Sequence, residues 1–338
     1  LEKAATLLMI PDYLHWKLSG ECRAEFTNAS TTQCFDPSTG DWAWPLIERA
    51  GLPRHLFPRI ERPGARLGPL RSDIALPCGL SAAEVILPAT HDTGSAVAAV
   101  PTEHTGKATW AYISSGTWSL MGVEVNKPAL SPGVLAENLT NEGGVDGTFR
   151  LLKNIMGMWL VQQCRKSFER QGRPLTYPEL AALAQEAPPM RSLVDPDHPS
   201  FLSPADMPTA IRDRCRETGQ PVPDTEGSLI RCALESLAMK YAQTLSALER
   251  ATGQKISVVH IVGGGSQNEL LNQWTANACG VPVLAGPVEA TALGNLLIQV
   301  RSTGAIGSLT ELREVVRNST QPKLFLPARS GLPSQPPS

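Results

Sequence analysis

ISVVHIVGGGSQNELLNQWTANA, residues 256–278, is the most strongly patterned segment of the chain. Its apolar, β-branched start predicts a buried strand up to Val262, the three glycines predict a turn, and the remainder predicts a helix from about Gln267. Glycines at such a turn let backbone N–H groups approach a ligand closely, and the helix N-terminus favours phosphate or ribose oxygens. The segment therefore predicts nucleotide binding at the turn, with a purely structural strand-to-helix turn as the alternative.

Two other kinds of nucleotide site fit this segment less well. A dinucleotide-binding fingerprint would need a third glycine where Asn268 stands, and Glu289 falls beyond the end of the next predicted strand. No Gly-x-x-x-x-Gly-Lys-Ser/Thr occurs in the sequence, which excludes P-loop chemistry. The sequence therefore favours neither a dinucleotide-binding site nor a P-loop at the glycine turn.

Strands and helices alternate on both sides of this segment. We predict strands at 85–88, 108–114, 117–125, 256–262 and 281–284, and helices at 4–18, 44–50, 95–100, 149–170, 177–186, 205–218, 227–251, 267–278 and 289–300. This alternation predicts an α/β fold. We place a domain boundary near residue 100, with domains at 1–100 and 101–303 and a tail at 304–338, and we expect the proline-rich end from Pro322 to be poorly ordered.

A turn rich in hydroxyl groups, Ser114-Ser115-Gly116-Thr117-Trp118-Ser119, separates two of these strands. A glycine at the tip exposes backbone amides, and the flanking hydroxyls can donate to phosphate oxygens. An ordinary Ser/Thr β-turn without a ligand is the alternative.

His91-Asp92-Thr93-Gly94-Ser95 follows the strand at 85–88, at the end where α/β proteins bind ligands. A carboxylate there can accept a hydroxyl proton while the hydroxyl attacks phosphorus, as a kinase base does. Asp92 could instead cap the following helix. Asp-Thr-Gly-Ser also matches an aspartic protease turn, but no second Asp-Thr/Ser-Gly is present, so that interpretation would require a dimer.

Composition narrows the class of function. The 338 residues are 42% hydrophobic, and 30 basic against 32 acidic residues give a net charge of −2, without the basic stripe that nucleic-acid binding requires. No apolar stretch reaches the roughly 18 residues of a membrane span. Seven scattered cysteines form no Cys-x-x-Cys pair, which argues against zinc and favours a reducing cytoplasm. We expect Cys215 and Cys232 to lie close enough to bridge if oxidised.

Taken together, these segments resemble the FGGY family of sugar kinases over residues 1 to about 303. The resemblance is carried by LMIPDYL (8–14), TNASTTQ (27–33), HDT (91–93), SSGTWSL (114–120), LKNIMG (152–157) and GGGSQNELLNQ (263–273). It implies a two-domain, actin-like ATPase (ribonuclease H-like) fold that binds ATP and Mg²⁺.

The resemblance also implies roles for individual residues. Asp92 would be the catalytic base, with His91 and Thr93 beside it on the sugar. Thr117 would contact phosphate, Asn154 and Gln162 would contact the nucleotide from a long helix at 149–170, and Gly264 would belong to the adenosine motif.

The resemblance further implies phosphoryl transfer from ATP to a ketose, L-rhamnulose, with small-molecule partners only. A kinase for a fuculose- or xylulose-type sugar and a non-catalytic nucleotide- or sugar-binding remnant remain alternatives. The family begins with an acidic, glycine-containing phosphate loop that does not appear after Leu1. We therefore expect the sequence to be N-terminally truncated, with an incomplete first domain.

Overall fold

The computed structural model describes residue 1 and residues 3–328, and the chain divides into two compact units. The first unit combines residues 1–107, 124–152 and 289–320, and the second combines residues 108–123, 153–288 and 321–338. Each unit thus joins three segments from distant parts of the sequence. The predicted boundary near residue 100 instead divides the chain into consecutive segments. That boundary stays a prediction.

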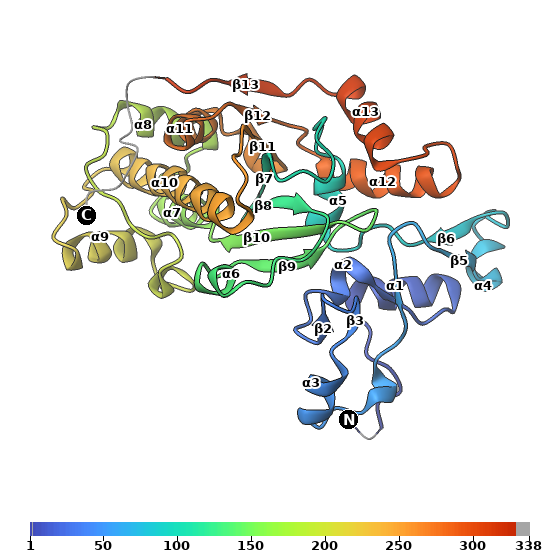
Figure 1. The fold of residues 1–338 in the computed structure, drawn as a ribbon. Helices are drawn as coiled ribbons and strands as arrows, with labels where there is room; N and C mark the ends of the chain where they lie inside the picture. The colour runs from blue at the N-terminus through green and yellow to red at the C-terminus, as the bar shows by residue number, and fades with distance from the viewer. Residues whose placement is uncertain (2, 329–338) are drawn as a thin grey trace. The chain divides into compact units, whose positions relative to one another are not determined.

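The first unit contains short strands and a group of packed helices (Figure 1). Its elements are α1 (Ile10–Ser19), β1 (Ala24–Glu25), α2 (Phe26–Ala29), β2 (Phe35–Asp36), β3 (Asp41–Trp42), α3 (Trp44–Arg49), η1 (Arg54–Leu56), β4 (Ile60–Glu61), β5 (Arg66–Pro69), α4 (Ser72–Ala75), β6 (Glu84–Ile86), α5 (Asp92–Ala98), α6 (Pro132–Ala136), β9 (Thr140–Gly143), α12 (Ala290–Ser302) and α13 (Leu309–Ser319).

Helix α1 begins at Ile10 and not at Ala4, where the sequence pattern placed its start. Pro11 stands at its first turn, where a missing N–H costs nothing. The helix ends at Gly20 in a left-handed conformation (φ 85°), as the glycine predicted.

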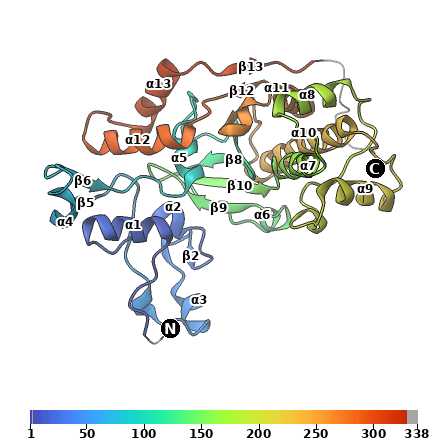
Figure 2. The same cartoon turned by 180° about the vertical axis from the view of Figure 1, so that it is seen from behind.

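Helices α5 and α12 pack closely against each other in this unit (Figure 2). Gly294 of α12 makes the close approach possible, because a Cβ at that position would overlap the Ser95 carbonyl of α5. Helix α5, which begins at Asp92, therefore lies very close to α12 at Ser95.

The second unit contains most of the large sheet and the helices that pack around α10. Its elements are β7 (Trp110–Ser115), α7 (Trp159–Arg170), α8 (Tyr177–Glu186), η2 (Pro199–Phe201), α9 (Met207–Glu217), α10 (Glu226–Thr252), β11 (Val258–Val262), η3 (Gly264–Gln267), α11 (Glu269–Cys279), β12 (Val283–Ala285) and β13 (Lys323–Phe325). Two further strands, β8 (Ser119–Val125) and β10 (Phe149–Ile155), run from one unit into the other along the chain.

The large sheet has the strand order β13-β12-β11-β7-β8-β10-β9. Strand β11 pairs in parallel with both β7 and β12, whereas β7 with β8 and β9 with β10 pair antiparallel. In the second unit, α10 packs against α7, α8 and α11, and its buried side chains supply much of the core (Figure 1). The predicted mixed α/β fold is confirmed.

Three parts of the sequence-based assignment are wrong. Residues 149–155 form strand β10, and only Trp159–Arg170 is helical, so the long helix predicted over 149–170 does not exist. Residues 140–143, where neither a strand nor a helix was predicted, form strand β9. Lys323–Phe325 forms strand β13 against β12, so the expectation of disorder fails for residues 322–328; residues 329–338 lie outside the described part.

Cys215 and Cys232 are both buried, and their thiols are hydrogen-bonded neighbours in the second unit. This hydrogen bond lowers the pKa of the Cys215 thiol from its usual value. Both residues are free thiols, and their oxidation to a disulfide stays a prediction.

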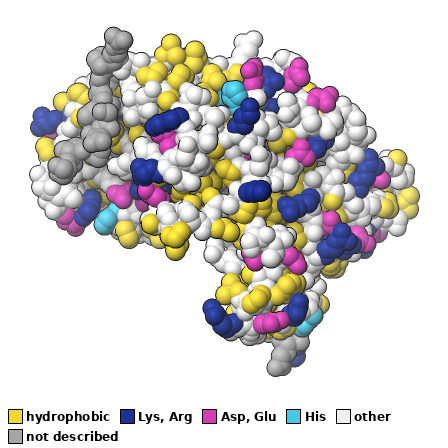
Figure 3. Space-filling view, viewed as in Figure 1, with side chains coloured by type: hydrophobic (Ala, Val, Ile, Leu, Met, Phe, Trp, Pro, Cys, Tyr) yellow, Lys and Arg dark blue, Asp and Glu magenta, His cyan; other side chains and the backbone are white. Residues whose placement is uncertain are grey.

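The surface carries charges of both signs. On the face drawn in Figure 3, Lys and Arg side chains are interspersed with Asp and Glu side chains. Among residues 1 and 3–328, no helix combines the length and hydropathy of a membrane span.

Candidate active site

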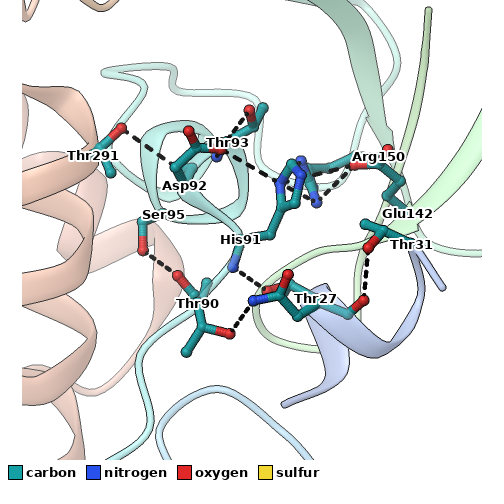
Figure 4. Close-up of polar contacts among 12 residues, drawn as sticks. Thr27, Thr31, Thr90, His91, Asp92, Thr93, Ser95, Glu142, Arg150 and Thr291 are labelled. Carbon is teal, nitrogen blue, oxygen red and sulfur yellow. Dashed lines mark hydrogen bonds and ion pairs between the residues drawn. The ribbon is translucent and has the colours of Figure 1, made fainter. Parts of the chain in front are cut away.

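Asp92 is the first residue of α5, on the turn that follows β6 in the first unit. Its carboxylate is 80% exposed, and its Oδ1 accepts hydrogen bonds from Thr93 N at 2.6 Å and Thr93 Oγ1 at 3.3 Å (Figure 4). Residue His91 stands at the N-cap position, and no side chain caps the helix. Asp92 is thus a fixed carboxylate open to solvent, and the capping role considered from the sequence is not the arrangement found.

The buried Arg150 and Glu142 and the half-buried His91 form a polar group near Asp92 in the first unit. Arg150 is fully buried, its Nε donates to Gly143 O at 2.9 Å, and its Nη2 lies 3.1 Å from Glu142 Oε2. Both terminal nitrogens of Arg150 lie 3.4 Å from Nδ1 of His91 (Figure 4). The guanidinium is therefore held on one side by β9 and directed at the imidazole on the other.

This contact fixes the tautomer of His91. A guanidinium has only donors, so Nδ1 of His91 accepts and the proton of the neutral imidazole is on Nε2. Burial lowers the pKa of His91 and the Arg150 charge lowers it further, while Glu142 and Asp92 act in the opposite direction. His91 is thus a neutral imidazole with its Nε2–H available as a donor.

The carboxyl groups of Asp12 and Glu25 are both buried in the first unit, and Glu25 accepts from Thr90 N beside the Asp92 turn. Asp12 is 1% exposed, and its Oδ1 accepts from the backbone N of Glu25 at 3.0 Å. Burial, and to a lesser extent the negative charge of Glu25, raise the pKa of Asp12 to about 7, although hydrogen bonds from the Glu25 and Met9 backbone oppose the shift. Asp12 is therefore protonated in the folded chain under mildly acidic conditions.

We predict that Asp12→Asn raises the melting temperature at pH 8 by more than at pH 5. The folded pKa is about 7 and the usual value is 3.8, so the folded chain holds more protons than the unfolded chain between these values, and wild-type stability falls as pH rises through that window. At about 1.4 kcal/mol per pKa unit, the loss is at most about 4 kcal/mol. Asparagine keeps the acceptor for Glu25 N and does not titrate. Thermal unfolding of both proteins at pH 5, 6, 7 and 8 measures the difference, and a constant difference across this range would contradict the prediction.

The second unit brings two of the predicted ligand-binding turns together. Strands β7 and β11 are parallel, with Ser114 opposite Val262, so the turn after β7 and the glycine turn after β11 lie at the same edge of the sheet. A Cβ on Gly265 would overlap the Ser115 side chain, and Gly263 has a φ of 85°. These two glycines are thus required by the packing of the two turns.

Gly264 differs from its two neighbours. It is exposed, and a Cβ there would meet no atom within 4 Å. The fold therefore does not require a glycine at this position.

The remaining predicted nucleotide contacts also belong to the second unit. Thr117 is exposed, and its carbonyl accepts from Trp159 N, so the start of α7 contacts this turn. Gln162 lies one turn further along α7 and is half-buried. Asn154 is exposed on strand β10, not on a helix as predicted. No cluster of three metal-ligating side chains occurs in the described part of the chain.

His91, Asp92 and Thr93 belong to the first unit, whereas Thr117, Asn154, Gln162 and Gly264 belong to the second. Thr93 is buried, with its side chain directed at Asp92. Sequence reasoning missed Glu25, Glu142 and Arg150, which complete the surroundings of the Asp92 turn.

Comparisons with known families identify the class of protein that this fold and this site define. Residues 1–99 match the N-terminal domain of the FGGY family of carbohydrate kinases, and residues 111–303 match its C-terminal domain. The chain belongs to the FGGY family of carbohydrate kinases.

Individual relatives narrow the comparison. The chain is 46% identical over 327 residues to the rhamnulokinase of Bacteroides thetaiotaomicron, covering 97% of this chain and 66% of the relative. It is 45% identical over 319 residues to the rhamnulokinase of Pectobacterium carotovorum, covering 94% of this chain and 62% of the relative. The chain therefore spans a little less than two thirds of the length of these curated relatives.

Solved structures support the fold. A ligand-bound xylulose kinase from Lactobacillus acidophilus superposes with a TM-score of 0.76 at 17% identity, covering 97% of this chain and 64% of that one. The glycerol kinase of Plasmodium falciparum with ADP superposes with a TM-score of 0.70 at 16% identity, covering 94% and 62%. The predicted actin-like ATPase fold is confirmed.

Proposed function

We propose that this chain supplies the catalytic base and nucleotide contacts of an ATP-dependent sugar kinase that converts L-rhamnulose to L-rhamnulose 1-phosphate. The observation that carries the proposal is Asp92, an exposed carboxylate held by Thr93 in a chain of the FGGY family. The choice of sugar rests on the identity of 45–46% to two rhamnulokinases.

In the proposed reaction, Asp92 accepts the proton of the sugar hydroxyl while that oxygen forms a bond to the γ-phosphorus of ATP. The bond from the γ-phosphorus to the β,γ-bridging oxygen breaks, and ADP leaves. His91 donates from Nε2 to an oxygen of the sugar, in the neutral state that Arg150 favours. The chain's contribution is therefore to orient the sugar and to receive its proton.

We propose that ATP contacts the second unit at Gly264 and Thr117, with Asn154 and Gln162 as further contacts. The open space at Gly264 and the exposed hydroxyl-rich turn fit a nucleotide. Mg²⁺, which neutralises phosphate charge in such reactions, needs only one or two carboxylates beside the phosphates, so a protein cluster of three ligands is not required.

Release of ADP by the intact protein tests the proposal. We expect turnover with L-rhamnulose and ATP that exceeds turnover with L-fuculose or D-xylulose by at least about tenfold in kcat/KM, a difference of about 1.4 kcal/mol. Faster turnover with either other ketose would replace the substrate assignment. Absence of turnover with all three sugars would favour a non-catalytic sugar- or nucleotide-binding protein.

Gly264→Val is expected to raise the KM for ATP by at least about tenfold, because a branched side chain would stand where the nucleotide meets backbone. The KM for the sugar should stay close to the wild-type value. The melting temperature should also be unchanged, because the position is open.

Gly265→Ala provides the matched contrast for this test. Its Cβ would overlap Ser115, so this variant should lose thermal stability whether or not a nucleotide binds there. Steady-state kinetics with both substrates varied, together with thermal unfolding, separates the two variants. An unchanged KM for ATP in Gly264→Val would mean that the turn is only structural.

A further inference from the structure

Glu25 is a fully buried carboxylate that joins two segments of the first unit 65 residues apart. Its Oε1 accepts from Thr27 N at 2.9 Å, and its Oε2 accepts from Asn28 N at 3.2 Å and from the Thr27 hydroxyl. Oε2 also accepts from Thr90 N at 3.0 Å and Thr90 Oγ1 at 2.8 Å. The carboxylate thus satisfies donors from α2 and from the turn before Asp92 at the same time.

The charge of Glu25 has few counterparts around it. The Asp12 carboxyl group accepts from the backbone N of Glu25. The positive charge that acts on Glu25 is the guanidinium of Arg62. Burial raises the pKa of Glu25, while hydrogen bonds from Thr27 and Thr90 act in the opposite direction. Burying a carboxylate costs free energy unless the carboxylate is hydrogen-bonded or paired. The hydrogen bonds that Glu25 accepts therefore suggest a role beyond filling space.

Thr27 continues the hydrogen-bonded connection from Glu25 towards Asp92, the proposed base. Its Oγ1 accepts from His91 N at 3.1 Å (Figure 4). The same hydroxyl donates to Glu25, so it joins the carboxylate to the backbone next to Asp92. The absence of a side chain at Gly94 lets α5 pack on this threonine, because a Cβ there would lie 3.3 Å from Thr27 Cγ2. The amide of residue 90 is thus held by Glu25 and that of residue 91 by Thr27.

We propose that Glu25 is a positioning residue for the transfer step: through Thr27 and Thr90 it fixes the backbone of residues 90 and 91, and thereby the direction of the Asp92 carboxylate. The inference rests on the proposed function of Asp92 as the base. Glu25 itself does not reach the exposed face of the turn and would not touch the sugar. Its effect should therefore appear in kcat more than in the KM for ATP.

Glu25→Gln tests this role in the intact protein. The amide keeps the size of the side chain but cannot accept at both ends, so one of the donors from α2 or the turn loses its partner. We expect kcat to fall about 10- to 100-fold, the range that a misplacement of about 1 Å produces, with the KM for ATP unchanged. Asp12→Asn is the matched control, because asparagine still accepts from Glu25 N and no contact to Thr90 is lost; its kcat should match the wild type.

A second pair of variants keeps the test decisive if Glu25→Gln does not fold. Thr27→Val removes the hydroxyl at constant shape, whereas Thr27→Ser keeps it, so the serine variant should retain at least about tenfold more kcat than the valine variant. Amide hydrogen exchange at residues 90 and 91 should accelerate in Glu25→Gln and in Thr27→Val only.

The outcomes separate failure of the positioning role of Glu25 from failure of the proposed function. Folded Glu25→Gln with wild-type kcat and wild-type exchange at residues 90 and 91 overturns the positioning role, as does equal kcat in Thr27→Val and Thr27→Ser. A wild-type protein without turnover on any of the three ketoses instead overturns the proposed function.

Discussion

Asp92→Asn is expected to lower kcat for sugar phosphorylation by about 10²–10⁴-fold, the usual contribution of a general base. Asparagine has the shape of aspartate and can still accept the hydrogen bonds from Thr93 N and Oγ1, so the turn should keep its conformation. What is lost is the group that receives the proton of the attacking hydroxyl. The KM for the sugar should therefore stay within about threefold of the wild type, because ground-state binding is retained.

Steady-state kinetics on the intact protein, with sugar and ATP each varied, measures this effect. Asp73→Asn is a suitable control, because Asp73 is an exposed carboxylate of the same unit that pairs with the exposed Arg71. Its kcat should equal that of the wild type. Wild-type kcat in Asp92→Asn would remove Asp92 from the role of base and leave it as a structural residue of the turn.

The sequence was sufficient for most helices and for the glycine turn, but not for strand β10. Residues 149–152 are buried on both faces of the sheet, so they show no alternation of apolar and polar side chains. Their apolar positions continue in register with those of α7, and the two elements together imitate one long helix. A strand buried on both sides cannot be separated from a helix by periodicity alone.

The exposed part of the candidate site was predictable because its residues occur in short motifs. Glu142 and Arg150 were missed because neither has a local pattern, and each matters only through a partner on the opposite strand. Their pairing across the antiparallel strands β9 and β10 is the available signal: Gly143-Gly144 and Asp146-Gly147 between them are typical of a hairpin. Glu25 carried no such signal, since its partner Thr90 is 65 residues away.

Arg313 forms a buried ion pair with Glu124 in the first unit. Its Nη1 lies 3.0 Å from Glu124 Oε1, its Nη2 lies 2.7 Å from Oε2, and Nη2 also donates to Val97 O at the end of α5. Glu124 in addition accepts from Gly106 N at 2.6 Å. The pair thus links α13, the loop before β7 and the helix that begins at Asp92.

Arg313→Ala is expected to lower the free energy of unfolding by about 3–5 kcal/mol, because it leaves Glu124 charged and buried without its partner. Glu314→Ala, an exposed change on the same helix, should stay within about 0.5 kcal/mol of the wild type. Urea unfolding followed by tryptophan fluorescence gives the free energy of unfolding of the wild type and of both variants.

The double variant Glu124→Met/Arg313→Met distinguishes loss of the pair from loss of packing. Replacing both charges by apolar side chains removes the uncompensated carboxylate, so most of the stability should return. The recovery should be incomplete by about 1 kcal/mol, because the half-buried Gly106 N would then lose its acceptor. If the double variant is no more stable than Arg313→Ala, the cost arises from the lost volume and contacts of Arg313, and the charge of Glu124 is not its cause.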